Sequence, residues 1–158
     1  DNLWDCLGSL LGCYPQSKYY FGKVTMYPQL ERTVRDMILY FIQKHFPDTE
    51  HLVTVRPELD LPILTDEAWL ASVLCHDNYR DDYKTLVKQV RERGAAVPPL
   101  VNAYMNLSST LRSFGTALNP GFGEVEETGI LVTIADIYQE KVERHMVYDK
   151  NEVPFHLK

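Results

Sequence analysis

Apolar residues recur at the spacing of an amphipathic helix in several stretches of this chain. The clearest stretch runs from Leu30 to Phe46, and Pro47 ends it because proline cannot continue a helix. Pro28 is placed to stand in the first turn of this helix. Leu3–Gly12 has the same spacing. Further helices are predicted to start at Thr65 or Asp66, at Asp77, at Pro98 and at Asp136.

Three other stretches have the composition of strands. Tyr19–Tyr27 alternates, with Val24 and Met26 on one face. Thr128–Ile134 carries apolar residues on both faces, which predicts a strand that is buried on both sides, and Phe114–Leu118 is predicted to be a short strand. The resulting order of elements indicates an α/β or α+β fold. It has too few strands for a large sheet of its own, so further strands would have to complete it.

The length of 158 residues fits one domain. We expect residues 1–146 to form this domain. The last stretch, 147–158, is polar and contains Pro154, so we expect a loosely ordered tail.

Charge and composition exclude several classes of function. The formal net charge is −6, and lysine and arginine are scattered, which argues against a nucleic-acid-binding face. No apolar run is long enough to span a bilayer, and no signal peptide is visible. The three cysteines, Cys6, Cys13 and Cys75, have no metal-binding spacing and cannot all pair. A sparse, odd number of cysteines suits a reducing cytoplasm, which is the location we expect.

The histidines give no sign of a metal site. None of the five forms a pair with the spacing of metal ligands, so we expect no metal and a structural or exposed role for each. They are His45, His51, His76, His145 and His156.

Residues 97–137, VPPLVNAYMNLSSTLRSFGTALNPGFGEVEETGILVTIADI, carry a resemblance to a known family. The segment resembles the closing part of bacterial GNAT-type N-acyltransferases of the family that carries a hemolysin label, whose relatives make ornithine lipids and glycine lipids. The features shared are a Pro-Pro-Leu helix start, a tyrosine one turn later, a turn ending in phenylalanine, acidic residues and an apolar strand. The start of the chain, with Leu3-Trp4 and Tyr20-Phe21-Gly22, is similar to the same family.

The resemblance implies the C-terminal part of a GNAT-like acyltransferase fold, with residues 48–93 as an added helical insert. The glycine-rich turn that holds the donor's pyrophosphate would come before Asp1. The implied reaction moves a fatty acyl group from acyl carrier protein, or from acyl-CoA, to the amine of a small amino acid in aminolipid synthesis. The implied partners are therefore the carrier protein and the amino acid. The donor thioester takes the place of a covalently bound cofactor, and peripheral contact with the inner membrane is a further expectation.

The resemblance also suggests site residues. Glu126 and Glu127 are candidate general bases, because the family has an acidic residue at the turn before the apolar strand. The alternative is that both are solvated turn carboxylates. The candidates for substrate binding are Phe21, Pro99, Asn102 and Tyr104. For Tyr104 the alternative is a core residue with its hydroxyl at the rim. The family often has a basic residue where this chain has Asn102, which leaves the acceptor amine open.

Two other functions stay open at this stage. The chain is compatible with a non-catalytic binding or assembly module that docks a carrier protein or a membrane-bound partner. It is also compatible with a homodimer in which each copy supplies the strands that the other needs. Activity with an amine acceptor would separate these alternatives from the acyltransferase.

Overall fold

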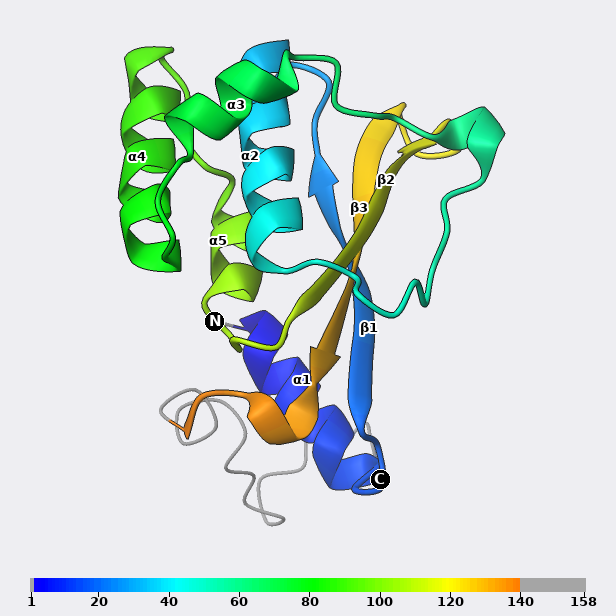
Figure 1. Ribbon diagram of the computed structural model, residues 1–158. Coiled ribbons are helices and arrows are strands. Elements are labelled where there is room, and N and C mark those ends of the chain that lie inside the picture. The colour runs from blue at the N-terminus through cyan, green and yellow to red at the C-terminus, as the bar shows by residue number, and fades with distance from the viewer. Residues whose placement is uncertain (1, 140–158) are drawn as a thin grey trace.

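A computed structural model of the chain describes residues 2–139 (Figure 1). The chain begins with helix α1 (Asn2–Cys13) and strand β1 (Tyr19–Met26), followed by the long helix α2 (Arg32–His45). Two short segments, η1 (Pro57–Leu59) and α3 (Glu67–Val73), and the second long helix, α4 (Tyr79–Glu92), then lead to α5 (Pro99–Met105). Strands β2 (Arg112–Asn119) and β3 (Val125–Thr133) and the turn η2 (Ile134–Asp136) complete the described part.

The three strands form one antiparallel sheet in the order β1-β3-β2. This confirms the expectation of a mixed fold of helices and strands, and the long β3 lies in the middle. In the register of β1 and β3, Val24 stands opposite Thr128 and Met26 opposite Glu126. An irregularity between Ser113 and Thr116 shifts the register of β2 against β3.

Helix α2 is the centre of the core, as its apolar spacing predicts. Val34, Met37, Ile38 and Phe41 are all 0% exposed. The helix begins one turn later than expected, because the side chain of Glu31 accepts hydrogen bonds from the backbone N–H groups of residues 33 and 34 and so caps it. The expectation that Pro28 stands in its first turn is therefore wrong: Pro28 lies in the turn before the cap.

Helices α3, α4 and α5 lie on the same side of the sheet as α2. Figure 1 shows α4 beside α2 and α3 across the upper ends of the two, and α5 contacts β1. Asp66 caps α3, as expected, by accepting from the N–H of Trp69. The cap of α4 is Asn78 and not Asp77, because the Asn78 side chain accepts from the N–H of Asp81.

Two further expectations need correction. The helix that starts at Pro99 ends at Met105, yet Leu107 and Leu111 remain buried. Their helical spacing therefore reflects burial in irregular backbone. Strand β3 starts at Val125, and its residues alternate between buried and partly exposed positions, so it is not buried on both sides. The expected continuation of a helix to residue 142 and the expected tail lie outside the described residues.

The long connection between α2 and α3 protects one edge of the sheet. The N–H of Ser113 donates to the carbonyl oxygen of Phe46 (2.8 Å), and the N–H of Leu61 donates to the carbonyl oxygen of Thr116 (2.9 Å). The outer edge of β2 is therefore covered, which keeps its free backbone groups from pairing with another chain.

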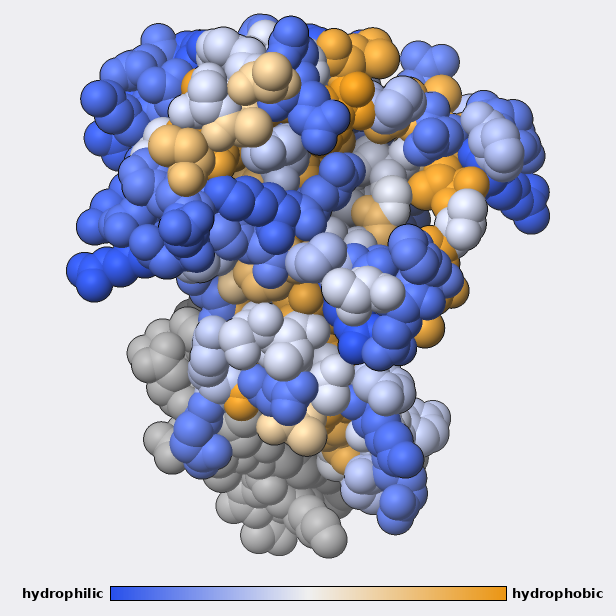
Figure 2. Space-filling model, in the orientation of Figure 1, coloured by the Kyte–Doolittle hydropathy of each residue, from blue (hydrophilic) through white to orange (hydrophobic). Residues whose placement is uncertain are grey.

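The surface is mixed in character. Figure 2 shows polar side chains over most of one face, with hydrophobic side chains at the surface in separate patches. Among the helices of residues 2–139, none is long and apolar enough to cross a membrane.

Candidate functional site

An apolar groove of about 600 Å³ lies where the end of β1 meets the start of α5. The turn after β1 and the residues before α5 form its walls. The lining residues are Thr25, Met26, Tyr27, Gln29, Leu30, Ala95, Ala96, Pro98, Pro99 and Leu100. Hydrocarbon groups dominate this lining, so the groove suits an apolar ligand. Pro99, one of the residues suggested for substrate binding, lies in it.

Two of the suggested binding residues lie further along α5. The side-chain oxygen of Asn102 accepts from the hydroxyl of Tyr83 (2.6 Å) and from the amide of Asn106 (2.8 Å). Asn102 therefore joins α5 to α4. Tyr104 is half-buried, and burial raises the pKa of its hydroxyl. That hydroxyl lies beside Gly22, 3.6 Å from where a Cβ atom of residue 22 would be.

Phe21 lies on the other face of the sheet. Neighbouring residues of a strand point to opposite faces, so Phe21 faces away from Gly22 and from α5. Its ring stacks on that of Phe114, with 5.9 Å between the ring centroids, and Phe21 remains 65% exposed. Three of the suggested binding residues thus lie on α5, but only Pro99 lines the groove, and the fourth lies elsewhere.

The two candidate bases lie inside β3 and not at a turn. They are consecutive, so they point to opposite faces of the sheet. Glu126 Oε2 accepts from Arg35 Nε (2.5 Å), and Glu127 Oε1 pairs with Lys23 Nζ (2.6 Å). The hydrogen bond from Lys23 lowers the pKa of Glu127. Each carboxylate thus has an ionic partner, and the role of either as a base stays a prediction.

Arg35 is the centre of a buried polar network under this part of the sheet. Besides Glu126, its guanidinium pairs with Asp36 and donates to the carbonyl oxygens of Leu61 and Pro62. Asp36 in turn accepts from both N–H and hydroxyl of Thr65. Burial by itself would raise the pKa of Asp36, but the hydrogen bonds from Arg35 and Thr65 outweigh burial and lower it. The network ties α2 to the segment before α3.

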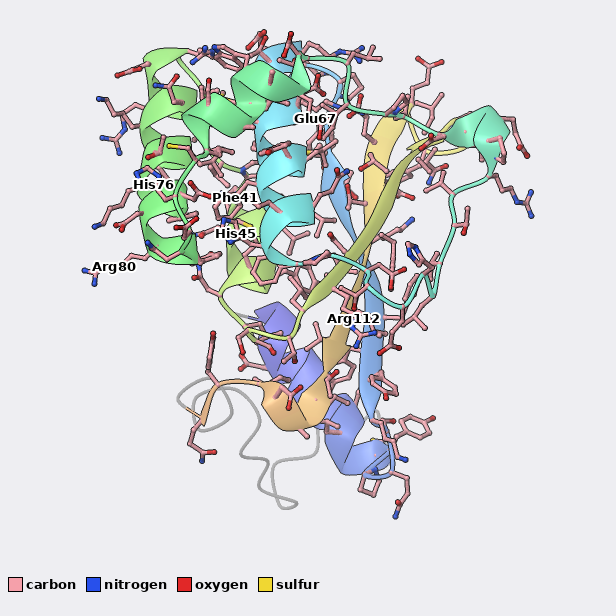
Figure 3. All side chains as sticks on the ribbon, in the orientation of Figure 1. Phe41, His45, Glu67, His76, Arg80 and Arg112 are labelled. Carbon is pink, nitrogen blue, oxygen red and sulfur yellow. The ribbon has the colours of Figure 1, made fainter. Side chains whose placement is uncertain are left out.

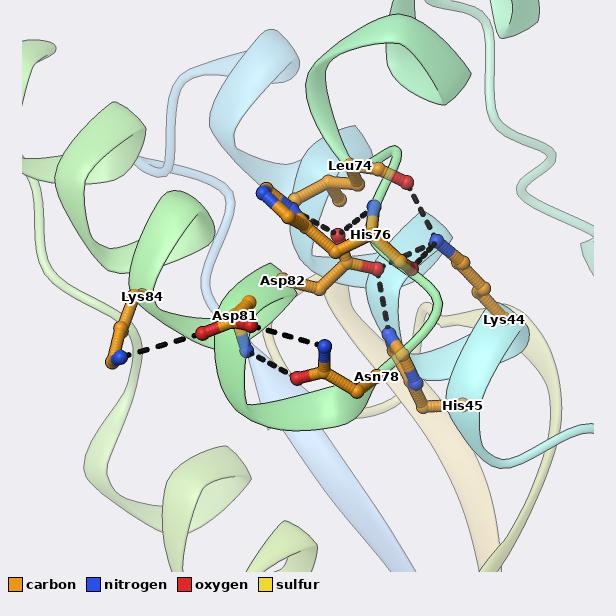
Figure 4. Close-up of polar contacts among 8 residues, drawn as sticks. All are labelled: Lys44, His45, Leu74, His76, Asn78, Asp81, Asp82 and Lys84. Carbon is orange, nitrogen blue, oxygen red and sulfur yellow. Dashed lines mark hydrogen bonds and ion pairs between the residues drawn. The ribbon is translucent and has the colours of Figure 1, made fainter.

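A second polar cluster lies between α2 and α4 (Figure 4). Asp82 is fully buried, and its carboxylate accepts from Lys44 Nζ (2.6 Å) and His45 Nε2 (2.8 Å). It also accepts from the backbone N–H of His76 (3.0 Å) and lies 3.1 Å from His76 Nδ1. Burial would raise the pKa of Asp82, but these hydrogen bonds, with Lys44 first, outweigh burial and lower it. Asp82 is therefore ionised at neutral pH.

Spacing along the chain did not reveal this cluster, because His45 and His76 are far apart in sequence. One signal was available: Asp82 falls on the apolar side of α4, with Leu86 and Val90, and a buried acid needs partners. Figure 3 shows Phe41 and His45 on the side of α2 that faces α4. Within the described residues no group of three or more histidine, cysteine or acidic side chains could hold a metal ion.

The chain is similar to two curated proteins, both named glycine N(alpha)-acyltransferase. One is from Phocaeicola vulgatus and the other from Bacteroides thetaiotaomicron. Each is 53% identical to this chain over 146 residues, which is 92% of the chain and 44% and 43% of the two relatives. The chain therefore spans less than half the length of the curated relatives it matches. This identity relates nearly the whole chain to acyltransferases.

No protein-family model matches the chain, and no solved structure matches it significantly.

Proposed function

We propose that this chain is part of an N-acyltransferase that moves a fatty acyl group from a thioester to the α-amine of a small amino acid, glycine first among the candidates. The observation that carries the proposal is the 53% identity over 146 residues to proteins named for this reaction. The apolar groove beside α5 supports it independently, because a fatty acyl chain needs an apolar site.

The reaction sets clear demands on the site. The amine nitrogen attacks the thioester carbonyl carbon, a C–N bond forms and the C–S bond breaks. The acceptor ammonium must first lose a proton to a base, and a second proton from its nitrogen goes to the leaving thiolate. Hydrogen-bond donors must meet the carbonyl oxygen as it gains negative charge. The groove would hold the acyl chain, with Pro99 and Leu100 against it.

The donor is proposed to be the thioester of acyl carrier protein, with acyl-CoA as the alternative. The chain as a whole is acidic, which disfavours the approach of an acidic carrier. Helix α4, however, has exposed basic residues along its outer side, and Figure 3 shows one of them, Arg80, pointing outward. The others are Lys84, Lys88 and Arg91. Lys84 pairs with Asp81 and Lys88 with Glu92, so an acidic carrier would meet these basic residues beside acidic neighbours.

The test uses the protein expressed from its complete reading frame. Release of free thiol and formation of the amide are followed with acyl carrier thioester and with acyl-CoA, each against a panel of amino acids. Transfer to glycine or another small amino acid supports the proposal. Hydrolysis alone, or no reaction with any amine, contradicts it and favours a binding or assembly role.

A substitution in the groove tests the acyl site. Ala96→Trp fills the groove, and Ala71→Trp, at an exposed position of α3 outside the groove, is the matched control. We expect Ala96→Trp to lower kcat/KM for long acyl chains by about tenfold or more relative to short ones, because two lost methylene contacts at about 0.8 kcal/mol each amount to about 1.6 kcal/mol. Equal effects of the two variants would place the acyl chain elsewhere.

A further inference from the structure

A small cavity of mixed character lies at the other end of α5 from the groove. Its volume is about 180 Å³, which holds a ligand of a few heavy atoms and not a long acyl chain. Phe46 and Met105 give it an apolar wall, and polar groups come from His45, Tyr79, Asn106, Ser108, Ser109 and Tyr138. Because α5 has 7 residues, about 10 Å of helix at 1.5 Å per residue separates the two ends. Two sites of different chemistry thus flank one short helix.

His45 has the geometry of an oriented base. Its Nε2 lies 2.8 Å from the ionised carboxylate of Asp82, which can only accept a hydrogen bond. The proton of a neutral imidazole is therefore held on Nε2, and Nδ1 keeps its lone pair. In the part of the chain that the structure describes, Nδ1 has no hydrogen-bond partner. The ring is fixed between Phe41 (4.6 Å between centroids) and Tyr79 (5.7 Å).

The cavity also offers groups for a carboxylate. Burial raises the pKa of Tyr79 to about 12, so its hydroxyl stays protonated and can donate. That hydroxyl donates a long hydrogen bond to the side-chain oxygen of Asn106 (3.5 Å), which a ligand carboxylate could replace as acceptor. Ser109, on the exposed rim, has a second hydroxyl. Two neutral hydroxyls beside a basic nitrogen fit a small molecule with both an ammonium and a carboxylate group.

We propose that this cavity binds the small amino-acid acceptor and that Nδ1 of His45 takes the proton of its ammonium group, with Asp82 as the positioning residue. The inference rests on the proposed function. The free amine then attacks the thioester carbon, the C–N bond forms, and the C–S bond breaks. A second proton from the nitrogen goes to the thiolate, and the imidazolium returns the first proton to water.

The surroundings of His45 favour this proton transfer over one to the two glutamates. Glu126 and Glu127 are each paired with a cation, whereas the ring of His45 is paired with an anion. Several other titratable groups surround the ring. They are Tyr79 and Asp82 of α4, His76 of the segment before α4, Lys44 of α2 and Tyr138 near the end of the described residues.

The first test is His45→Gln in the protein from the complete reading frame, with His51→Gln, at an exposed loop position, as the matched control. Glutamine can still donate to Asp82 but cannot act as a base. We expect kcat for amide formation to fall by about 100-fold or more. The rate of the variant should rise again at pH values where the acceptor amine is free in solution.

The second test does not depend on the base. Ser109→Trp plugs the cavity from its exposed rim, and Ser72→Trp on α3 is its control. We expect the KM for the amino acid to rise by about tenfold or more and the KM for the thioester to stay unchanged. A direct titration of the protein with glycine should show the same loss of binding.

The outcomes separate the two proposals. If the wild-type protein transfers to no amine, the proposed function fails and this inference falls with it. If the wild-type protein is active but His45→Gln keeps its rate and pH profile, the inference is wrong and the proposed function stands. A loss of rate in His45→Gln that high pH does not restore, with unchanged KM in Ser109→Trp, also overturns it.

Discussion

Asp82 should be one of the most sensitive positions for stability, because a single buried carboxylate serves four N–H donors. Asp82→Asn keeps the shape but removes the charge, and one of the two acceptor oxygens becomes a donor. Two of the four hydrogen bonds are then lost, and Lys44 is left without its anion. Removing one partner of a buried ion pair costs about 3–5 kcal/mol. The Lys44 side chain is 30% exposed, which places the expected loss at about 3 kcal/mol, the lower end of that range.

Urea unfolding measures this loss directly. With a slope of about 2 kcal/mol per molar, a loss of about 3 kcal/mol lowers the midpoint by about 1.5 M. Asp81→Asn is the matched control, because Asp81 is the preceding residue of the same helix and pairs with Lys84 at the surface. We expect little change for Asp81→Asn, since exposed ion pairs contribute little to stability.

The pH dependence gives an independent check with a defined sign. The pKa of Asp82 is lowered in the folded protein. Its contribution is therefore complete above the ordinary value of about 3.9 in the unfolded chain and is lost as pH falls through the lower folded value. The difference between wild type and Asp82→Asn should shrink as pH falls below about pH 4. Equal midpoints for wild type and Asp82→Asn at pH 7, or a difference that does not shrink below about pH 4, would refute the reasoning.

Three other substitutions test separate parts of the structure. Arg35→Met leaves two carboxylates without their cation and should cost about 3–5 kcal/mol, measured by the same unfolding experiment. Gly115→Ala places a Cβ atom in a clash with Val55 Cγ2, so it should destabilise by about 1–3 kcal/mol, and Val55→Ala in the same protein should recover much of this. Phe41→Ala should cost about 3–5 kcal/mol because Phe41 is fully buried, whereas Phe21→Ala should cost less, and thermal melting that ranks them in the opposite order would contradict the described core.

The sequence by itself determined the local structure of this protein. Helix α2 was predictable because its apolar spacing and the proline after it act within a few residues. The alternation of β1 and the Asp66 cap of α3 act over the same range. Where the prediction failed, as at Pro28 and Leu111, a local signal was present but a cap or the demand for burial decided the boundary.

The tertiary structure decided which of these elements meet. The middle position of β3, the groove beside Pro99 and the separation of Phe21 from α5 depend on contacts between strands and helices far apart in the chain. The same holds for the cluster around Asp82, in which His45 and Asp82 are 37 residues apart. A periodic pattern shows which face of an element is buried, but it does not show what lies against that face. Hydrophobic burial is non-directional, so the partners of Asp82, His45 and Glu126 follow only from the packed fold.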